Sequence, residues 1–171
     1  MVFAPRRYRR CLPGPFRRSP RRRRRYRLVV RDAAAGAAAG IGFVLFLDQF
    51  PRNLFRDDGR AFAYDARARA AVRRLIAGGV ERFAPIERVF LYLPFEHSEE
   101  LADQDLSVSL YEALLAEVPE ADKEDYQSFV GYAEKHRDLI RRFGRFPHRN
   151  ADLGRASTPE EIEFLKDGRG Y

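Results

Sequence analysis

From residue 41 onward, apolar residues recur every three or four positions, the spacing of one face of a helix. Val108, Tyr111 and Leu115 illustrate this pattern. No segment shows the strict alternation that is typical of a half-buried strand. The pattern predicts helices over residues 41–50, 61–77, 85–94, 98–118, 122–143 and 158–166. It therefore predicts an all-α fold, in which antiparallel helix pairs are joined by short loops.

Several helix ends are marked by residues that stop or cap a helix. Pro51 lacks a backbone N–H and should end the first helix near Phe50. Gly144 follows the helix over residues 122–143, as is usual for a helix exit. Thr158 and Glu161 are three residues apart and predict a capping box, in which each side chain binds the other residue's backbone amide.

Residues 1–32 have a different composition from the rest of the chain. They hold thirteen arginines and a single acid, and leave 19 basic and 24 acidic residues elsewhere, so the net charge of +7 comes from one end. The segment is interpreted as an arm that binds RNA or a membrane surface, as a solvated tail, or as a stretch of a GC-rich gene translated from a wrong start or frame. The lack of a periodic apolar face favours the last interpretation. We therefore divide the chain into an Arg/Ala-rich segment at residues 1–40, disordered or misframed, and a single helical domain at residues 41–171.

Composition also limits where the protein works. The low-polarity stretch from Ala33 to Leu47 is too short to span a bilayer, and Asp48 follows it where a signal peptide would have a small-residue cleavage site. Cys11 is the only cysteine and cannot form an internal disulfide, which indicates a reducing, cytoplasmic setting. We expect no membrane partner, and a nucleic-acid partner only if the arginine-rich start is authentic.

Two short segments nearly repeat each other at predicted helix exits. We call residues 50–53 (Phe-Pro-Arg-Asn) the first corner and residues 146–150 (Phe-Pro-His-Arg-Asn) the second corner. Arginine binds carboxylates and phosphates bidentately, so two such corners could grip a small anionic ligand or an acidic peptide. Alternatively, Arg52 pairs internally with Glu96 or Glu100, and the presence of these acids between the corners favours that pairing.

A third polar cluster lies between the corners. His97, Glu100 and Gln104 are three and four residues apart, so they would share one face of a helix that starts near Glu96. Carboxylates raise the pKa of a neighbouring histidine, which suits an acid, a base or a metal ligand. The alternative is that Glu96 and His97 only satisfy an arginine and a helix end.

The chain has three histidines, and their spacing matches no zinc signature, so we expect no metal site. His136 lies in a charged stretch and is expected on a solvated or partly packed helix face. The sequence also lacks a glycine-rich phosphate loop, a nucleophile elbow and a Cys/His dyad, and it predicts no cofactor. An enzyme built on this chain would rely on acid–base chemistry by histidine and carboxylate side chains.

These observations leave three hypotheses: a binding protein, which we favour; an acid–base enzyme; and a scaffold whose motifs only lock helix corners. The candidate ligand-binding residues are Arg52, Asn53, Glu96, His97, Glu100, Gln104, His148, Arg149 and Asn150. The candidate catalytic residues of an enzyme are His97, Glu96, His148 and Asp48.

Four ordered segments, residues 47–53, 91–100, 142–150 and 153–161, resemble those of the domain-of-unknown-function 924 family, an uncharacterised and mainly bacterial family. The resemblance covers the chain from about residue 42 to its end. It implies a helical fold similar to tetratricopeptide-repeat proteins and no established activity. Glu100 stands where the family has an aspartate.

The resemblance also bears on the start of the chain. Family members carry a tryptophan-containing helical region before the first motif, and this chain has no tryptophan. The resemblance therefore implies that the usual N-terminal helices are missing here and that apolar surface on their neighbours is exposed.

Overall fold

The computed structural model describes residues 36–166, and within this range the chain is helical, with no strand. The predicted all-α class is confirmed. Its α-helices are α2 (Ala37–Leu54), α3 (Asp65–Ala77), α4 (Pro85–Glu96), α5 (Leu101–Glu117), α6 (Lys123–Phe143) and α7 (Pro159–Lys166). Short 3-10 helices join them: η1 (Gly59–Phe62), η2 (Val80–Arg82), η3 (Glu120–Asp122) and η4 (Pro147–Arg149). The interpretations of residues 1–35 lie outside the described residues.

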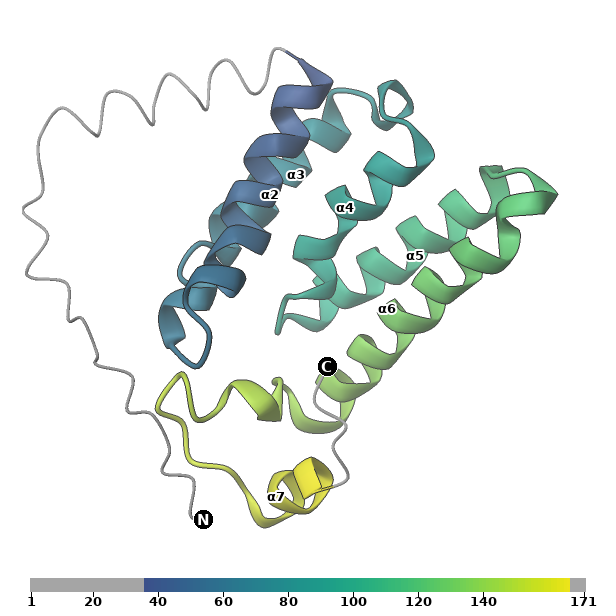
Figure 1. Cartoon of the computed structure of the whole chain (residues 1–171). Coiled ribbons are helices and arrows are strands. Elements are labelled where there is room, and N and C mark those ends of the chain that lie inside the picture. Colours follow the sequence, from purple (N-terminus) through teal and green to yellow (C-terminus); the bar gives the residue numbers. More distant parts are fainter. Residues whose placement is uncertain (1–35, 167–171) are drawn as a thin grey trace, which may run out of the picture.

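The helices are arranged as two antiparallel pairs around α4. Helices α2 and α3 lie side by side, and α5 and α6 form a long hairpin (Figure 1). Helix α4 lies between the two pairs and contacts helices of both. After α6 the chain turns back beneath the other helices through η4, and its described part ends in α7 (Figure 1). This return segment closes one end of the molecule. The relation to tetratricopeptide repeats stays a prediction.

Helix α4 forms the centre of the core because most of its residues are apolar or aromatic. Leu91, Tyr92 and Phe95 are buried against the neighbouring helices. The Tyr111 hydroxyl from α5 donates to the Val89 carbonyl over 2.9 Å, which joins α5 to α4. Burying an aromatic side chain of this size contributes about 2 to 3 kcal/mol. This packing positions the C-terminal end of α4 between the two helix pairs.

The first helix extends past its proline. Pro51 was expected to end the helix near Phe50, but α2 continues to Leu54. The side chains that follow the proline add donors to this last turn: Arg52 donates to the Asp48 carbonyl over 2.8 Å, and Asn53 Nδ2 donates to the Gln49 carbonyl over 2.9 Å. Because these carbonyls lie one turn earlier, the two donors stabilise the last turn of the helix.

The helix that was expected to start near Glu96 begins later. Helix α4 ends at Glu96, His97 lies at its C-terminus, and α5 begins at Leu101. Gln104 Nε2 donates to the carbonyls of Glu96 and Ser98 over 2.6 and 2.7 Å, and so caps the end of α4. The turn between α4 and α5 therefore separates His97 from Gln104, and the prediction that they share one helix face was wrong.

Two other predictions about helix ends are confirmed. The Thr158 amide donates to the Glu161 carboxylate over 2.7 Å, and the Glu161 amide donates to the Thr158 hydroxyl over 3.2 Å, which is the expected capping box. Gly144 ends α6 with a φ of 68°, in the left-handed region that glycine adopts without strain.

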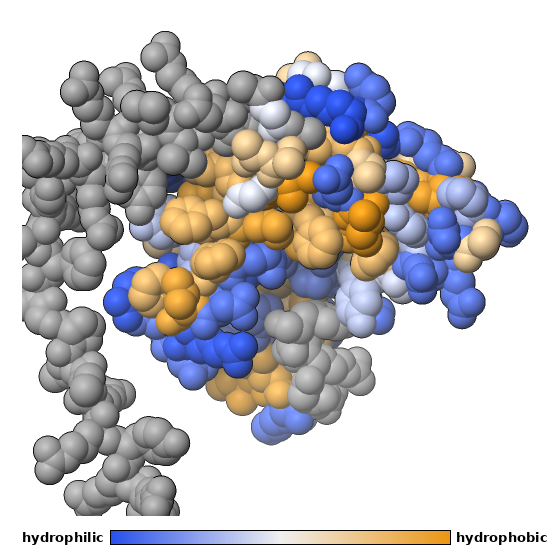
Figure 2. All heavy atoms as spheres, turned by 45° about the horizontal axis from the view of Figure 1, so that its top comes forward, coloured by the Kyte–Doolittle hydropathy of each residue, from blue (hydrophilic) through white to orange (hydrophobic). Residues whose placement is uncertain are grey.

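Several large apolar side chains of α2 are exposed to solvent. Phe46, Phe50 and Leu54 are spaced four residues apart on one side of the helix and expose 46%, 55% and 70% of their surface. Figure 2 shows hydrophobic residues gathered on one face, with hydrophilic residues on either side of them. None of the helices between residues 36 and 166 is long and apolar enough to cross a membrane.

Candidate functional site

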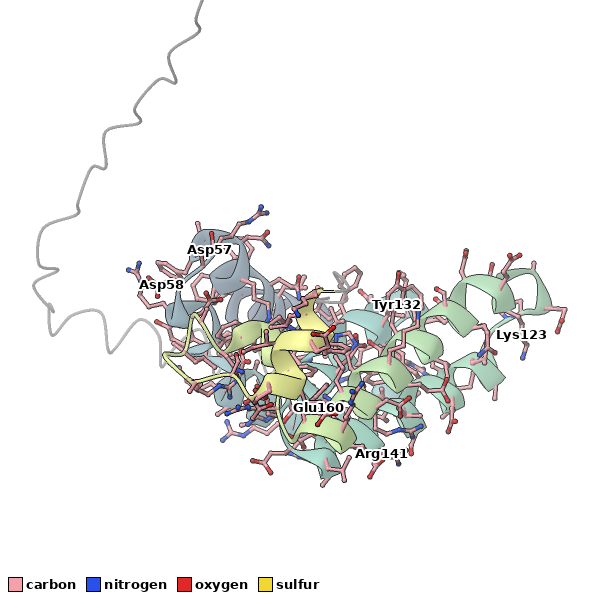
Figure 3. All side chains as sticks on the ribbon, turned by 90° about the horizontal axis from the view of Figure 1, so that it is seen from below. Asp57, Asp58, Lys123, Tyr132, Arg141 and Glu160 are labelled. Atoms are coloured by element: carbon pink, nitrogen blue, oxygen red, sulfur yellow. The ribbon has the colours of Figure 1, made fainter. Side chains whose placement is uncertain are left out.

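A cavity of about 590 Å³ lies where the chain after α2, the end of α4 and η4 meet one side of α6. A volume of this size is typical of small-molecule sites. Figure 3 labels two of the residues that line it: Asp57, from the loop after α2, and Tyr132, from α6. The cavity is lined by Arg52, Phe55, Arg56, Asp57, Ala61, Phe62, Glu96, His97, Tyr132, His136, His148, Arg149 and Asp152.

The arginine of the first corner is paired with carboxylates of the described residues. Arg52 binds both carboxylate oxygens of Asp65, over 2.9 and 3.0 Å, in a bidentate fork. The same guanidinium lies 3.4 Å from the Asp48 carboxylate. Arg52 therefore pairs internally, as one alternative proposed, but with acids other than the expected Glu96 and Glu100. Its partner Asp65 begins α3, so the pair joins α2 to α3.

The arginine of the second corner is incompletely paired. Arg149 is only 5% exposed, and its guanidinium lies between the rings of Phe62 and Phe146, 4.7 and 4.3 Å from their centroids. Within the described residues it makes one hydrogen bond, from Nη1 to the His97 carbonyl over 3.0 Å, and its buried Nε has no acceptor. Burial and the neighbouring Arg52 lower the pKa of Arg149 to about 10, so the group still carries its charge at neutral pH.

The nearest carboxylate does not complete this arginine. Asp65 Oδ2 lies 3.7 Å from Arg149 Nη1, beyond hydrogen-bond distance, and both Asp65 oxygens already accept from Arg52. A guanidinium has five N–H donors, and most of those on Arg149 lack an acceptor in the described residues. The cavity wall thus presents a buried cation that has free donors.

His97 and Asp48 form a close pair beside this cation. His97 Nδ1 lies 2.9 and 3.0 Å from the two oxygens of Asp48, whose side chain is only 1% exposed. Burial raises the pKa of Asp48, but His97 and Arg52 outweigh this effect and lower the pKa to about 2. The ionised Asp48 accepts the Nδ1 proton of His97, which leaves Nε2 as the other ring nitrogen.

Glu96 and His136 form a second pair on the cavity wall. His136 Nδ1 lies 3.2 Å from Glu96 Oε1 and 2.9 Å from the Tyr132 carbonyl. Burial raises the pKa of Glu96 to about 7 and lowers the pKa of His136 to about 4, because it disfavours the charged form of each group. This part of the wall is therefore less charged at neutral pH than its residue types suggest.

His148 belongs to the second corner and also lines the cavity. Its Nδ1 is buried and has no hydrogen-bond partner within the described residues. Burial and the neighbouring Arg149 lower its pKa to about 4, so the imidazole is neutral at pH 7. A neutral imidazole can donate one hydrogen bond and accept another.

The other candidate ligand-binding residues lie away from the cavity wall. Asn53 is exposed and bonds to its own helix, and Glu100 is an exposed residue before α5. Gln104 is buried under the end of α4. Asn150 donates to Ser157 and Glu161 and accepts from Arg155, in a network that holds the return segment together. The ligand-binding role predicted for these four residues stays untested.

Some residues of the site were not anticipated from the sequence. His136 was expected on a solvated or partly packed face, but it is buried and lines the cavity. Its spacing of three and four residues from the buried Ala133 and Ile140 is a signal that could have identified it. No comparable signal points to Asp65, because its pairing with Arg52 depends on how α3 packs against α2.

Glu99, next to the expected Glu100, is the glutamate that supports the second corner. Its carboxylate accepts from the Phe146 amide over 2.8 Å and from two nitrogens of Arg155 over 2.6 and 2.9 Å. Glu99 thus holds the second corner against the end of α4. Across the described residues, no group of three or more His, Cys, Asp or Glu side chains is arranged to hold a metal ion.

Comparison with known proteins gives a family and no activity. The sequence profile of the family described as "Bacterial protein of unknown function (DUF924)" matches residues 16–169. A solved structure of a protein of unknown function from Agrobacterium tumefaciens is similar in sequence and fold, with 37% identity, a TM-score of 0.73, and coverage of 84% of this chain and 76% of that chain. Among curated proteins the search found no match.

Proposed function

This chain belongs to the DUF924 family of bacterial proteins of unknown function, and we propose that it binds a small anionic ligand or an acidic peptide in the cavity described above. Arg149 supplies the principal contact. Because the single cysteine of the sequence indicates a reducing setting, we propose that the protein binds its ligand in the cytoplasm.

One observation carries the proposal: the buried guanidinium of Arg149 lines the cavity without a hydrogen-bonded carboxylate. Burying a charge that is not fully paired lowers the stability of a protein. Arg52, by contrast, donates to both carboxylate oxygens of Asp65. The fold can therefore supply a bidentate carboxylate partner to an arginine that has a structural role. An anion in the cavity would complete Arg149 in the same way.

The surrounding groups suit an anion. Neutral His148 offers a hydrogen-bond donor, and the raised pKa of Glu96 reduces the negative charge that a ligand would meet. The aromatic rings of Phe62 and Phe146 lie against the guanidinium, and such apolar surroundings strengthen its attraction for an anion.

Thermal unfolding of the full chain with inorganic phosphate and with succinate tests this function, with sodium chloride of equal ionic strength as control. We expect either anion to raise the Tm of the wild-type protein with increasing concentration. Arg149→Met should keep a Tm near that of the wild type and lose the anion effect. Arg149→Lys retains the charge and serves as the matched control, with a weaker response. A Tm that rises equally in Arg149→Met and wild type would contradict the proposal.

A second candidate function, acid–base catalysis on the bound anion, is favoured by the contact between His97 and Asp48. An ionised carboxylate that accepts from Nδ1 orients the ring and makes Nε2 a better proton acceptor. Of the two histidines considered for this role, His97 contacts a carboxylate, while His148 Nδ1 has no partner in the described residues.

Turnover assays separate the two functions. Compounds that raise the Tm should be incubated with the wild-type protein and with His97→Gln and Asp48→Asn. Catalysis predicts that the wild type consumes at least one of them and that both variants are slower by about 10²-fold or more. Ligands that bind and are never consumed would leave the binding function alone.

The third hypothesis, a scaffold whose motifs lock helix corners, accounts well for Asn53, Asn150 and Glu99. It gives no reason to bury Arg149 without a carboxylate in hydrogen-bond distance. We therefore assign the asparagines to structure and Arg149 to binding.

A further inference from the structure

We propose that the ligand is a zwitterion of the amino-acid type, whose anionic group binds Arg149 and whose ammonium group binds Asp57 and Asp152. This inference rests on the proposed function, because it names the ligand class of the same cavity. A free amino acid and the termini of a short peptide share this chemistry.

Asp57 and Asp152 come from two chain segments that touch each other. Asp57 lies in the loop after α2, and Asp152 follows η4. Gly59, two residues after Asp57, packs against the second segment so closely that a Cβ atom there would lie 2.8 Å from the Asp152 carbonyl oxygen. Both aspartates line the cavity. We call these two residues the acidic wall.

Neither carboxylate of the acidic wall forms an ion pair with any described residue. The adjacent Asp58, by contrast, is paired: its carboxylate accepts from Nε and Nη2 of Arg60 over 3.0 and 2.8 Å. Arg56 also lines the cavity, is exposed and forms no ion pair with either wall residue within the described residues. The acidic wall thus has acceptors free for a cation from solution.

Asp152 of the acidic wall and Arg149 belong to one turn of the chain, and both line the cavity. Asp152 follows Arg149 by three residues, and the Leu153 amide donates to the Arg149 carbonyl over 3.0 Å, which closes this turn. The guanidinium extends between Phe62 and Phe146 and does not pair with Asp152. Two opposite charges that are neighbours in sequence are therefore kept apart, and both face the cavity.

This separation favours a ligand with both charges over a simple anion. A simple anion would neutralise Arg149 but would meet two unpaired carboxylates, which repel it. A zwitterion neutralises both groups and gains charge-assisted hydrogen bonds at each end. The cavity volume of about 590 Å³ is large enough for a short peptide as well as a single amino acid.

Matched ligands that differ only in the ammonium group test this inference by calorimetric titration of the full chain. The pairs are alanyl-alanine with N-acetyl-alanyl-alanine, and alanine with propionate. We expect the free amine of at least one pair to bind about tenfold more tightly than its acylated or des-amino form. Whichever pair shows the preference identifies a peptide or a single amino acid as the better ligand.

Variants locate the effect in the acidic wall. The double variant Asp57→Asn/Asp152→Asn should lose the tenfold preference and bind the N-acetyl form at least as well as the wild type does. Asp58→Asn is the matched control, since Asp58 is already paired with Arg60, and it should keep the preference.

Two results would overturn the inference. The first is that N-acetyl-alanyl-alanine and propionate bind as tightly as the free amines. This result would overturn the zwitterion inference and leave the proposed function intact. A failure of all four compounds to bind would also overturn it. In that case Arg149-dependent stabilisation by phosphate or succinate would preserve the proposed function, and its absence would end both.

Discussion

Phe50 and Phe146 begin the two corners of this protein, and they lie in opposite environments. Phe50 exposes 55% of its surface on the outside of α2, whereas Phe146 is fully buried between α6 and the return segment. The asparagines differ in the same way: Asn53 is exposed, and Asn150 is buried within a network of hydrogen bonds.

The arginines show the difference that matters for function. Arg52 is held by two carboxylates, and Arg149 has one backbone acceptor within the described residues. The first corner is an outer helix end that joins α2 to α3. The second corner contributes His148 and Arg149 to the lining of the cavity. Similar local sequences thus acquire different roles, because each takes its partners from elements distant in the chain.

The largest expected effect concerns the two aromatic residues. Phe146→Ala should lower the free energy of unfolding by about 3 to 5 kcal/mol, because it empties a fully buried site. Phe50→Ala should lower it by less than about 1 kcal/mol, because more than half of that ring is already in water. Urea unfolding of the pair measures both values, and similar losses would contradict the contrast between the corners.

The arginines should respond in unequal ways to the same substitution. Arg52→Met leaves the carboxylates of Asp65 and Asp48 without their guanidinium and should cost about 2 to 3 kcal/mol. Arg149→Met removes a buried and incompletely paired charge, so the free energy of unfolding should change by less than about 1 kcal/mol or rise. Chemical unfolding without added anion measures this, and equal losses would show that Arg149 is structural.

Acid should act on the first corner through Asp48. Its folded-state pKa of about 2 lies below the ordinary value of 3.8, so its stabilising effect is complete above pH 3.8 and is lost as the pH falls toward 2. The effect is worth about 2 kcal/mol. Asp48→Asn should therefore be less stable than the wild type by about this amount at pH 6, with the gap narrowing toward pH 2. A gap that does not depend on pH would contradict the assigned ionisation.

The smallest expected effect concerns the asparagines. Asn150→Ala removes hydrogen bonds to Ser157, Glu161 and Arg155 in a buried network and should cost about 1 to 2 kcal/mol. Asn53→Ala removes one exposed hydrogen bond to the helix backbone and should cost less than about 0.5 kcal/mol. Thermal unfolding monitored by circular dichroism can rank the two variants, and a reversed order would count against the assigned roles.

The sequence predicted most of the helices because their signals are local. Apolar spacing marks the buried face of α6, and the Thr158 and Glu161 pair marks the start of α7. The prediction for Pro51 was wrong because the proline removes only one N–H from the helix, and the side chains of Arg52 and Asn53 add donors to the two carbonyls that follow Leu47.

The candidate site could be predicted only in part. Arg52, Glu96, His97, His148 and Arg149 do line one cavity. The partnerships of Arg52 with Asp65 and of His97 with Asp48 could not be deduced, because they depend on the packing of α3 and α4 against α2. Spacing along the chain carries no information about such contacts. For the same reason, the sequence predicted that Glu100 and Gln104 share a helix face with His97, although the turn between α4 and α5 interrupts the helix.

The central claim is that Arg149, and not Arg52, binds an anion. The Nε–H resonances of the arginines in the full ¹⁵N-labelled chain test it most directly, with assignments from Arg52→Met and Arg149→Met. During a titration with phosphate at constant ionic strength, we expect the Arg149 resonance to shift and saturate while that of Arg52 stays in place. An Arg149 resonance that does not move, or an equal shift of both, would contradict the account.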